Sequence, residues 1–157
     1  MSNPGLTLPV FVSLSSALTG VSAAQLKPDI DPVGIADQYF KALNGNVSET
    51  IRDDLAAEFQ SVSDPVLAAA KVLAHPVFGL IGRSIIKLWL LGAWYNPVNP
   101  SQAVNLVSAQ AYKESLVWKV MQSHPMGYSM FQFGYWDQAP PPLDQFILPA
   151  AASASAN

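Results

Sequence analysis

The sequence contains no cysteine among its 157 residues. Disulfide bonds, thiolate nucleophiles, zinc–cysteine sites, iron–sulfur ligands and the CxxCH haem attachment motif are therefore excluded. Histidine is almost as scarce, because only His75 and His124 are present and each directly precedes a proline. No carboxylate stands at metal-ligand spacing from either ring. We therefore expect no metal site, no bound cofactor and no catalytic residue in this chain, and we expect the histidines to cap a helix or to hydrogen-bond at an interface.

Charged residues are the next scarcity. They make up 12% of the chain, against roughly 25% in an average soluble domain. The net charge is -3 and the basic residues do not cluster. The sequence therefore lacks the basic patch that nucleic-acid binding requires. Because a free monomer needs surface charge to stay dispersed, so few charges favour a protein that covers part of its surface with a partner. The 50% apolar content indicates a single folded domain with a real core.

Motifs for catalysis are also missing. The sequence has no GxSxG, GxGxxG or P-loop pattern. Residues 84–87 match SxxK, but the KTG element that accompanies such a serine nucleophile is absent. A stand-alone enzyme is therefore the least favoured class of function.

Apolar residues at helical spacing predict an all-α fold, a small bundle of five or six helices that occupies residues 1–123. Aspartate–proline pairs predict two helix starts, and glycines or prolines predict the ends. The predicted helices cover Leu8–Thr19, Val33–Leu43, a segment after Ser48 that carries Ile51, Leu55 and Phe59, Val66–Ala74, Val77–Trp94 and Ser101–Ser123.

The most apolar of these segments is Val77–Trp94, which contains Arg83 and Lys87. Because two cations would be costly inside a membrane, we expect the buried central helix of the bundle and no transmembrane segment. The two cations lie one helical turn apart, with no acid three or four residues from either. One interpretation is that their stems cover apolar surface while their heads reach water. The other is that they bind acids, either of a partner or of the helix that contains Asp53 and Asp54.

After residue 123 the helical period is lost. Three consecutive prolines, residues 140–142, favour an extended arm over residues 124–149, followed by a low-complexity tail, 150–157, that we expect to be disordered. Aromatic residues are dense in this arm but have no helical or strand periodicity. They either cover the chain's own core or bind another protein, since tryptophan and tyrosine are enriched at protein–protein interfaces. We favour the second alternative. The candidate partner-binding residues, together with Arg83 and Lys87, are therefore His124, Tyr128, Phe131, Phe133, Tyr135, Trp136 and Phe146.

Four stretches carry a family resemblance. Residues 11–20 read FVSLSSALTG, and residues 36–43 follow the pattern A-x-x-Y-x-x-A-L. Residues 85–94 follow I-x-x-x-W-Y-x-G-x-W, with Leu90 in place of the aromatic, and residues 108–136 contain SAQAY, LVW, HPMGY and GYW in that order. In these stretches the chain resembles the small subunit of bacterial FAD-dependent sugar and polyol dehydrogenases, the sorbitol dehydrogenase-like small-subunit family.

The resemblance implies a specific role. In that family the small subunit accompanies a large flavoprotein with the glucose–methanol–choline oxidoreductase fold, often together with a cytochrome c subunit. The large subunit binds FAD and oxidises the hydroxyl of a sugar or alcohol. The small subunit carries no catalytic group, helps the flavoprotein to mature, and commonly bears a twin-arginine leader that exports the pair. The resemblance leaves open whether this chain is a permanent subunit or a dedicated export chaperone.

Location is expected to follow from the same resemblance. It implies the periplasm or the periplasmic face of the inner membrane, on the condition that a leader has been removed, because the sequence shows no twin-arginine motif. The competing hypothesis is a peripheral membrane-associated helical protein without a flavoprotein partner. The lack of clustered basic residues argues against that alternative.

Overall fold

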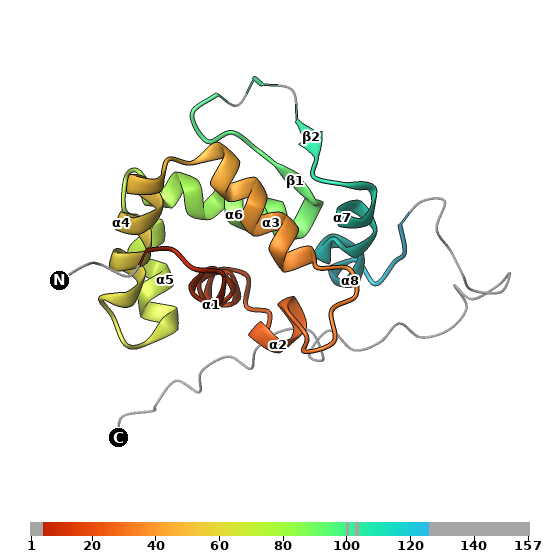
Figure 1. Ribbon diagram of the computed structural model, residues 1–157, viewed down its shortest axis with the longest axis horizontal. Coiled ribbons are helices and arrows are strands. Elements are labelled where there is room, and N and C mark those ends of the chain that lie inside the picture. Colours follow the sequence, from red (N-terminus) through yellow and green to blue (C-terminus); the bar gives the residue numbers. More distant parts are fainter. Residues whose placement is uncertain (1–4, 100, 103, 126–157) are drawn as a thin grey trace, which may run out of the picture.

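The computed structural model describes residues 5–99, 101–102 and 104–125. Helices dominate this part of the chain, and two very short antiparallel strands pair Ala93 with Leu106 and Trp94 with Asn105 (Figure 1). The predicted all-α fold is thereby confirmed. The elements are α1 Leu8–Thr19, α2 Ala23–Leu26, α3 Ile35–Asn46, α4 Glu49–Gln60, α5 Pro65–Ala74, α6 Phe78–Leu91, β1 Ala93–Trp94, β2 Asn105–Leu106, α7 Ala109–Glu114 and α8 Leu116–Val120.

The first helix lies at the centre of the molecule. Figure 1 shows α1 end-on between α4 and α5 on one side and α3 and α6 on the other. Its contacts with α2, α3, α4, α5 and α6 explain why Phe11 and Leu14 are completely buried. The helix ends as predicted at Gly20, whose φ of 74° lies in the left-handed region that glycine adopts without strain.

An aromatic cluster joins α1, α3 and α6. The rings of Tyr39 and Trp89 meet edge to face with centroids 4.8 Å apart, and Phe11 stacks on Trp89 at 6.3 Å. Such pairs stabilise a core beyond the area they bury, by about 0.5–1.5 kcal/mol each. Trp89 is therefore part of the core, only 3% exposed. Trp118, in contrast, is half-buried, and its indole N–H donates to the carbonyl of Tyr112 at 2.7 Å.

The sixth helix is the buried helix that its composition predicted, although it is shorter. It buries seven residues from Gly79 to Trp89. It stops at Leu91 because Gly92, with φ at 69°, turns the chain into β1. The last residues of the predicted span, Ala93 and Trp94, are therefore strand rather than helix.

Two proline-associated helix boundaries form as predicted. Asp64 caps α5, its Oδ1 accepting from the backbone N–H groups of Val66 at 2.8 Å and Leu67 at 2.9 Å. His75 ends α5 and then caps α6, because its Nδ1 accepts from the N–H groups of Val77 and Phe78, each at 3.2 Å. The prediction that His75 caps a helix is thus confirmed.

The third helix begins later and ends later than predicted. Asp31 Oδ1 does accept two backbone N–H groups, those of Val33 at 3.2 Å and Gly34 at 2.7 Å. However, Gly34 is left-handed, with φ at 62°, so these bonds close a turn and α3 starts at Ile35. The helix then continues to Asn46, past the predicted end at Leu43.

The predicted long helix Ser101–Ser123 is wrong. Within that span the structure has β2 and two short helices, α7 and α8, which are separated at Ser115. Ser108 caps α7, its Oγ accepting from Ala111 N–H at 3.0 Å, and Ser115 is extended, with ψ at 138°. Serine side chains that hydrogen-bond to nearby backbone groups compete with continuation of a helix. Here the strand pair and the serine caps interrupt the helix that the spacing of apolar residues predicted.

In the part of the chain that the structure describes, no single helix has both the length and the apolar character needed to cross a bilayer. Helices α5 and α6 have them only when taken together, and the chain bends by 116° between them, at His75-Pro76-Val77.

Candidate functional site

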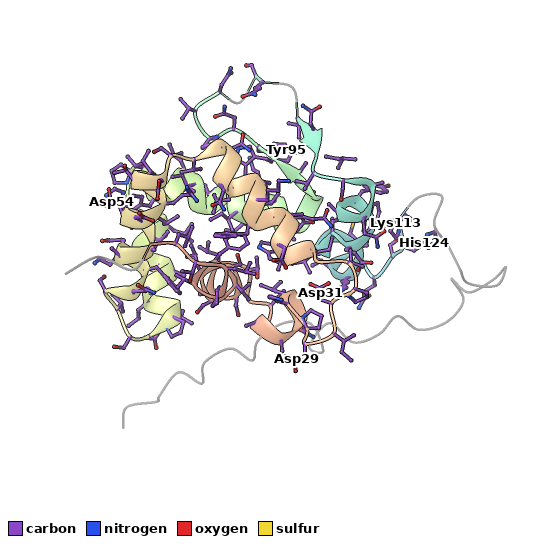
Figure 2. The ribbon with its side chains drawn as sticks, in the orientation of Figure 1. Asp29, Asp31, Asp54, Tyr95, Lys113 and His124 are labelled. Carbon is purple, nitrogen blue, oxygen red and sulfur yellow. The ribbon has the colours of Figure 1, made fainter. Side chains whose placement is uncertain are left out.

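Arg83 and Lys87, the two cations predicted to bind a partner, lie on the exposed face of α6. Lys87 places its Nζ 5.1 Å from the centre of the Tyr95 ring, a cation–π distance; Figure 2 labels Tyr95 beyond the end of that helix. Arg83 is also exposed and forms no hydrogen bond or ion pair with any residue in the described part of the chain. Within the described chain, its guanidinium therefore has no acid beside it.

Neither Asp53 nor Asp54 forms an ion pair with these cations among the described residues. Asp53, on α4, accepts the backbone N–H of Leu6 at 3.1 Å. The ion pair found among the described residues joins Lys71 to Glu58 at 3.2 Å. Of the two interpretations, binding to the helix of Asp53 and Asp54 is therefore wrong, and exposure to water or to a partner stands.

His124 lies just beyond α8, near the end of the described chain (Figure 2). It is half-buried, and its Nδ1 lies 3.0 Å from the carbonyl oxygen of Pro125. The other predicted partner-binding residues, Tyr128, Phe131, Phe133, Tyr135, Trp136 and Phe146, lie outside the described residues. The structure therefore places three of the predicted residues, two on α6 and one after α8.

An apolar groove runs between the end of α1, the exposed side of α6 and α8. Its walls include Leu18, Ile86, Leu90 and Val120, and it encloses about 120 Å³. Beside it α8 leaves Val120 51% and Met121 62% exposed. Exposed apolar side chains next to an apolar groove are typical of protein-binding surfaces. We call these residues, with Met121, the α8 groove.

A second hollow adjoins the α8 groove and shares Gln25, Leu116 and Lys119 with it. It encloses about 220 Å³ between α2, the connection from α2 to α3, α6 and α8. Figure 2 shows Asp31 in that connection. Trp89 also lines the hollow, and both residues bury a polar atom for which the described residues supply no hydrogen-bond partner. We call it the Asp31 hollow.

A third, larger hollow of about 540 Å³ is lined mainly by carboxamides, with Lys41 and Trp94. Some of its amides already bind each other or the backbone: Asn96 Nδ2 donates to Gln102 Oε1 at 2.6 Å, and Asn96 Oδ1 accepts from the N–H groups of Val98 and Asn99. Such a lining offers amide hydrogen bonds and one amine, that of Lys41.

The buried phenol of Tyr39 stays protonated. Burial, and secondarily the nearby charge of Glu114, raises the pKa of Tyr39 well above its usual range. The phenol is therefore a neutral donor, and it donates to the carbonyl of Ala111 at 3.3 Å. No group of three or more histidines, cysteines or acids that could hold a metal occurs in the part of the chain that the structure describes.

Sequence reasoning placed the binding surface in the aromatic segment and missed both hollows beside α8. Their walls come from positions as distant as Leu18 and Val120, so no local pattern marks them. The one available signal was Asp31, which was assigned to a helix cap. Comparison with family models, curated proteins and solved structures found no match to this chain.

Proposed function

We propose that this chain is a non-catalytic small subunit that binds and stabilises a large FAD-dependent sugar or alcohol dehydrogenase and assists its maturation and export. The observation that carries the proposal is the α8 groove, an apolar surface with Val120 and Met121 more than half exposed in a chain with 12% charged residues. The sequence resemblance supplies the identity of the partner. FAD, and where present a cytochrome c, belong to other subunits, and the complex resides in the periplasm or on the periplasmic face of the inner membrane.

The energetics of the groove favour a protein partner. Burying a valine or methionine side chain completely contributes about 1.5–3 kcal/mol, so covering the exposed halves of Val120 and Met121 contributes roughly 1 kcal/mol each. The aromatic stretch from Tyr128 to Trp136 follows α8 in the sequence after only a few residues. A partner that covers the groove is therefore within reach of the predicted aromatic anchors. Lys119 would lie at the polar rim of such an interface.

The test is co-expression of the tagged chain with the flavoprotein encoded beside it. We expect a stoichiometric complex that carries flavin absorbance and oxidises a sugar or polyol. Val120→Asp should lower the yield of complex at least about tenfold, because a carboxylate would be desolvated at the interface. A flavoprotein that folds, binds FAD and never co-purifies with the chain would overturn the proposal.

The matched control is Val66→Asp. Val66 is 62% exposed on α5, which lies across the molecule from α8 (Figure 1). The same change of side chain is therefore made at a similarly exposed valine away from the groove, where we expect an unchanged yield of complex. Equal loss in both variants would locate the interface elsewhere or point to a general effect of charge.

The alternative, a peripheral membrane protein, draws on a different surface. The bent pair of α5 and α6 is long and apolar when the two helices are taken together, and the exposed side chains on the pair and its connection include Val66, Leu67, Val77 and Leu80. Flotation of the purified chain with vesicles discriminates the two. We expect no flotation without the flavoprotein, because the chain has no cluster of basic residues to attract an interfacial helix to anionic lipid.

A further inference from the structure

The largest hollow described above lies between α3 and the strand pair. It encloses about 540 Å³, within the range of about 300–1,000 Å³ that small-molecule sites occupy. Five of the nine described residues that line it are asparagine or glutamine. None of the nine is buried, so each keeps a surface that a ligand can reach. We call it the amide hollow.

One wall of the amide hollow is a single face of α3. Gln38, Ala42 and Asn46 follow one another at intervals of four residues, and Lys41 stands three residues after Gln38. Residues three or four apart share one face of a helix. The small side chain of Ala42 separates the amides of Gln38 and Asn46, so this wall is polar with a recess in the middle.

The facing wall is one side of the strand pair. Trp94 of β1 and Asn105 of β2 are register partners. Residues directly opposite in an antiparallel pair carry their side chains on the same face, with Cβ atoms about 5 Å apart. Because both residues line the amide hollow, the face that bears the indole and the Asn105 amide is the one turned towards α3.

The amides of the two walls differ in what they already bind. Gln38 and Asn96 have both ends of their amides engaged within the chain. In the described part of the chain, Asn105 forms no side-chain hydrogen bond, Gln102 engages only its Oε1, and Asn46 engages only its Nδ2. The hollow therefore offers uncharged donors and acceptors from both walls.

We propose that the amide hollow binds a neutral carbohydrate, with a pyranose ring against the face of Trp94 and its hydroxyls bonded to the amides. A hydroxyl donates and accepts, as a carboxamide does. A pyranose ring carries C–H groups on its faces and hydroxyls around its rim. It therefore matches a partly exposed indole, which is flat and apolar, that stands between amides.

The lining disfavours other classes of small molecule. No acid is among the described residues that line the hollow, and Lys41 is the one cation among them, so a cation or a multiply charged anion would find little to balance its charge. A nucleobase can also stack on tryptophan. However, it carries its hydrogen-bonding groups in its own plane along one or two edges, whereas the amides here lie on two facing walls.

The proposal goes beyond the proposed function, because the site is built by this chain alone. The amide hollow and the α8 groove share no lining residue. A partner that covers the α8 groove therefore need not cover the amide hollow.

The first experiment titrates the full chain with the methyl glycosides of glucose, galactose and mannose. 2-Methoxytetrahydropyran, the same ring without hydroxyls, is the matched control. Saturation-transfer NMR measures binding, and the indole N–H resonance of Trp94, assigned with Trp94→Phe, reports the site. We expect at least one glycoside to bind with Kd on the order of 1 mM and to shift that resonance. The control should bind at least about tenfold more weakly.

Four results would overturn the proposal. They are no binding of any glycoside, equal binding of 2-methoxytetrahydropyran, binding that leaves the Trp94 resonance unshifted, and displacement of the bound glycoside by a lower concentration of 9-methyladenine or inorganic phosphate. The last would make the hollow a base or anion site. All four are measured on the free chain, so failure here is distinguishable from failure of the proposed function.

The second experiment compares Asn105→Ala with Asn99→Ala. Asn105→Ala removes one amide from the wall and should weaken glycoside binding about threefold to tenfold, with no effect on 2-methoxytetrahydropyran. Asn99 is exposed in the same connection but lies outside the lining, so Asn99→Ala should bind the glycoside as the unchanged chain does. Unchanged glycoside affinity in Asn105→Ala, with helical circular dichroism intact, would contradict the proposed contact.

Variants of Trp94 test the ring contact separately. Trp94→Leu removes the flat surface and should weaken glycoside binding about tenfold, whereas Trp94→Phe keeps a flat ring and should retain most of it. Equal binding by both variants, measured by saturation transfer, would remove the aromatic ring from the site.

The third experiment separates a free sugar from a sugar chain. The methyl glycoside that binds is compared with a linear tetrasaccharide of the same sugar. Affinity at least about tenfold higher for the tetrasaccharide assigns the amide hollow to a polysaccharide, and equal affinity assigns it to a free sugar. Failure of both to bind contradicts the site itself.

Discussion

Tyr39 connects three elements through one side chain. It lies on α3 and is fully buried, it meets Trp89 of α6 edge to face, and its hydroxyl donates to Ala111 of α7. The same burial that makes these contacts disfavours the phenolate. A residue that serves packing at neutral pH is therefore a point of weakness at alkaline pH.

We predict that Tyr39 makes the fold sensitive to alkali. Burial raises the pKa of Tyr39 in the folded state, whereas the unfolded chain loses the proton near pH 10. The free energy of unfolding should therefore be independent of this group below about pH 10 and fall above it, by about 1.4 kcal/mol per pH unit. Urea unfolding at a series of alkaline pH values measures the slope.

Tyr39→Phe is the control for that slope. It removes the hydrogen bond to Ala111 and should cost about 1 kcal/mol at neutral pH. It should also remove the part of the alkaline slope that belongs to Tyr39, so the two proteins converge in stability as pH rises. Parallel slopes in the two proteins would show that another group dominates the alkaline transition.

At the scale of elements, the corner between α5 and α6 depends on close backbone approach. A Cβ at Gly79 would lie 2.4 Å from the carbonyl oxygen of Leu73, whereas one at Gly45 on α3 would meet no atom within 4 Å. Both glycines are helical. Gly79 therefore permits the close contact between α5 and α6, whereas Gly45 has no such role in packing.

We predict opposite effects of alanine at these two glycines. Gly79→Ala should destabilise the protein by about 1–3 kcal/mol, because the clash with Leu73 forces α5 and α6 apart. Gly45→Ala should stabilise it by about 0.5–1 kcal/mol, since alanine loses less entropy in a helix. Urea midpoints of both variants provide the measurement. A Gly79→Ala protein as stable as Gly45→Ala would mean that the corner tolerates a wider crossing.

The elements also show where prediction from sequence succeeds and where it stops. Asp64-Pro65 and Gly20 act through atoms within three or four residues, so the α5 start and the α1 end were readable. The span Ser101–Ser123 was not, because its outcome depends on distant contacts: Trp94 pairs with Asn105, and Ser108 donates to Gln38 of α3 at 2.7 Å. The spacing of apolar residues alone could not predict the strand pair or the bond from Ser108 to Gln38.

The same limit applies to the candidate site. Exposure of Arg83 and Lys87 on a buried helix follows from their charge and could be predicted. The α8 groove could not, because it brings together the ends of helices about 100 residues apart in the chain. The pairing of Asp31 with Trp89 in one hollow is equally non-local.

At the scale of the whole molecule, one buried cluster joins the described helices. The buried cluster runs from Leu6 to Leu116 and draws on α1 to α8. The large apolar side chains outside this cluster that remain exposed include Val120 and Met121, beside the α8 groove. A chain with so little charge therefore has a folded body and an apolar face directly before its aromatic segment.

We predict that deletion of residues 128–148 weakens the complex with the flavoprotein more than it weakens the fold. The variant should retain most of its helical circular dichroism, because the described helices end at Val120. Its affinity for the flavoprotein should fall at least about tenfold through loss of aromatic anchors, in which truncation of a single hot-spot residue costs about 2 kcal/mol or more. Titration of the purified flavoprotein measures the first quantity, and urea unfolding followed by circular dichroism measures the second. Deletion of residues 150–157 serves as the control and should change neither. If helicity and affinity fall in parallel, the aromatic segment covers the chain's own core, and the partner contact reduces to the α8 groove, where Val120→Asp then remains the decisive variant.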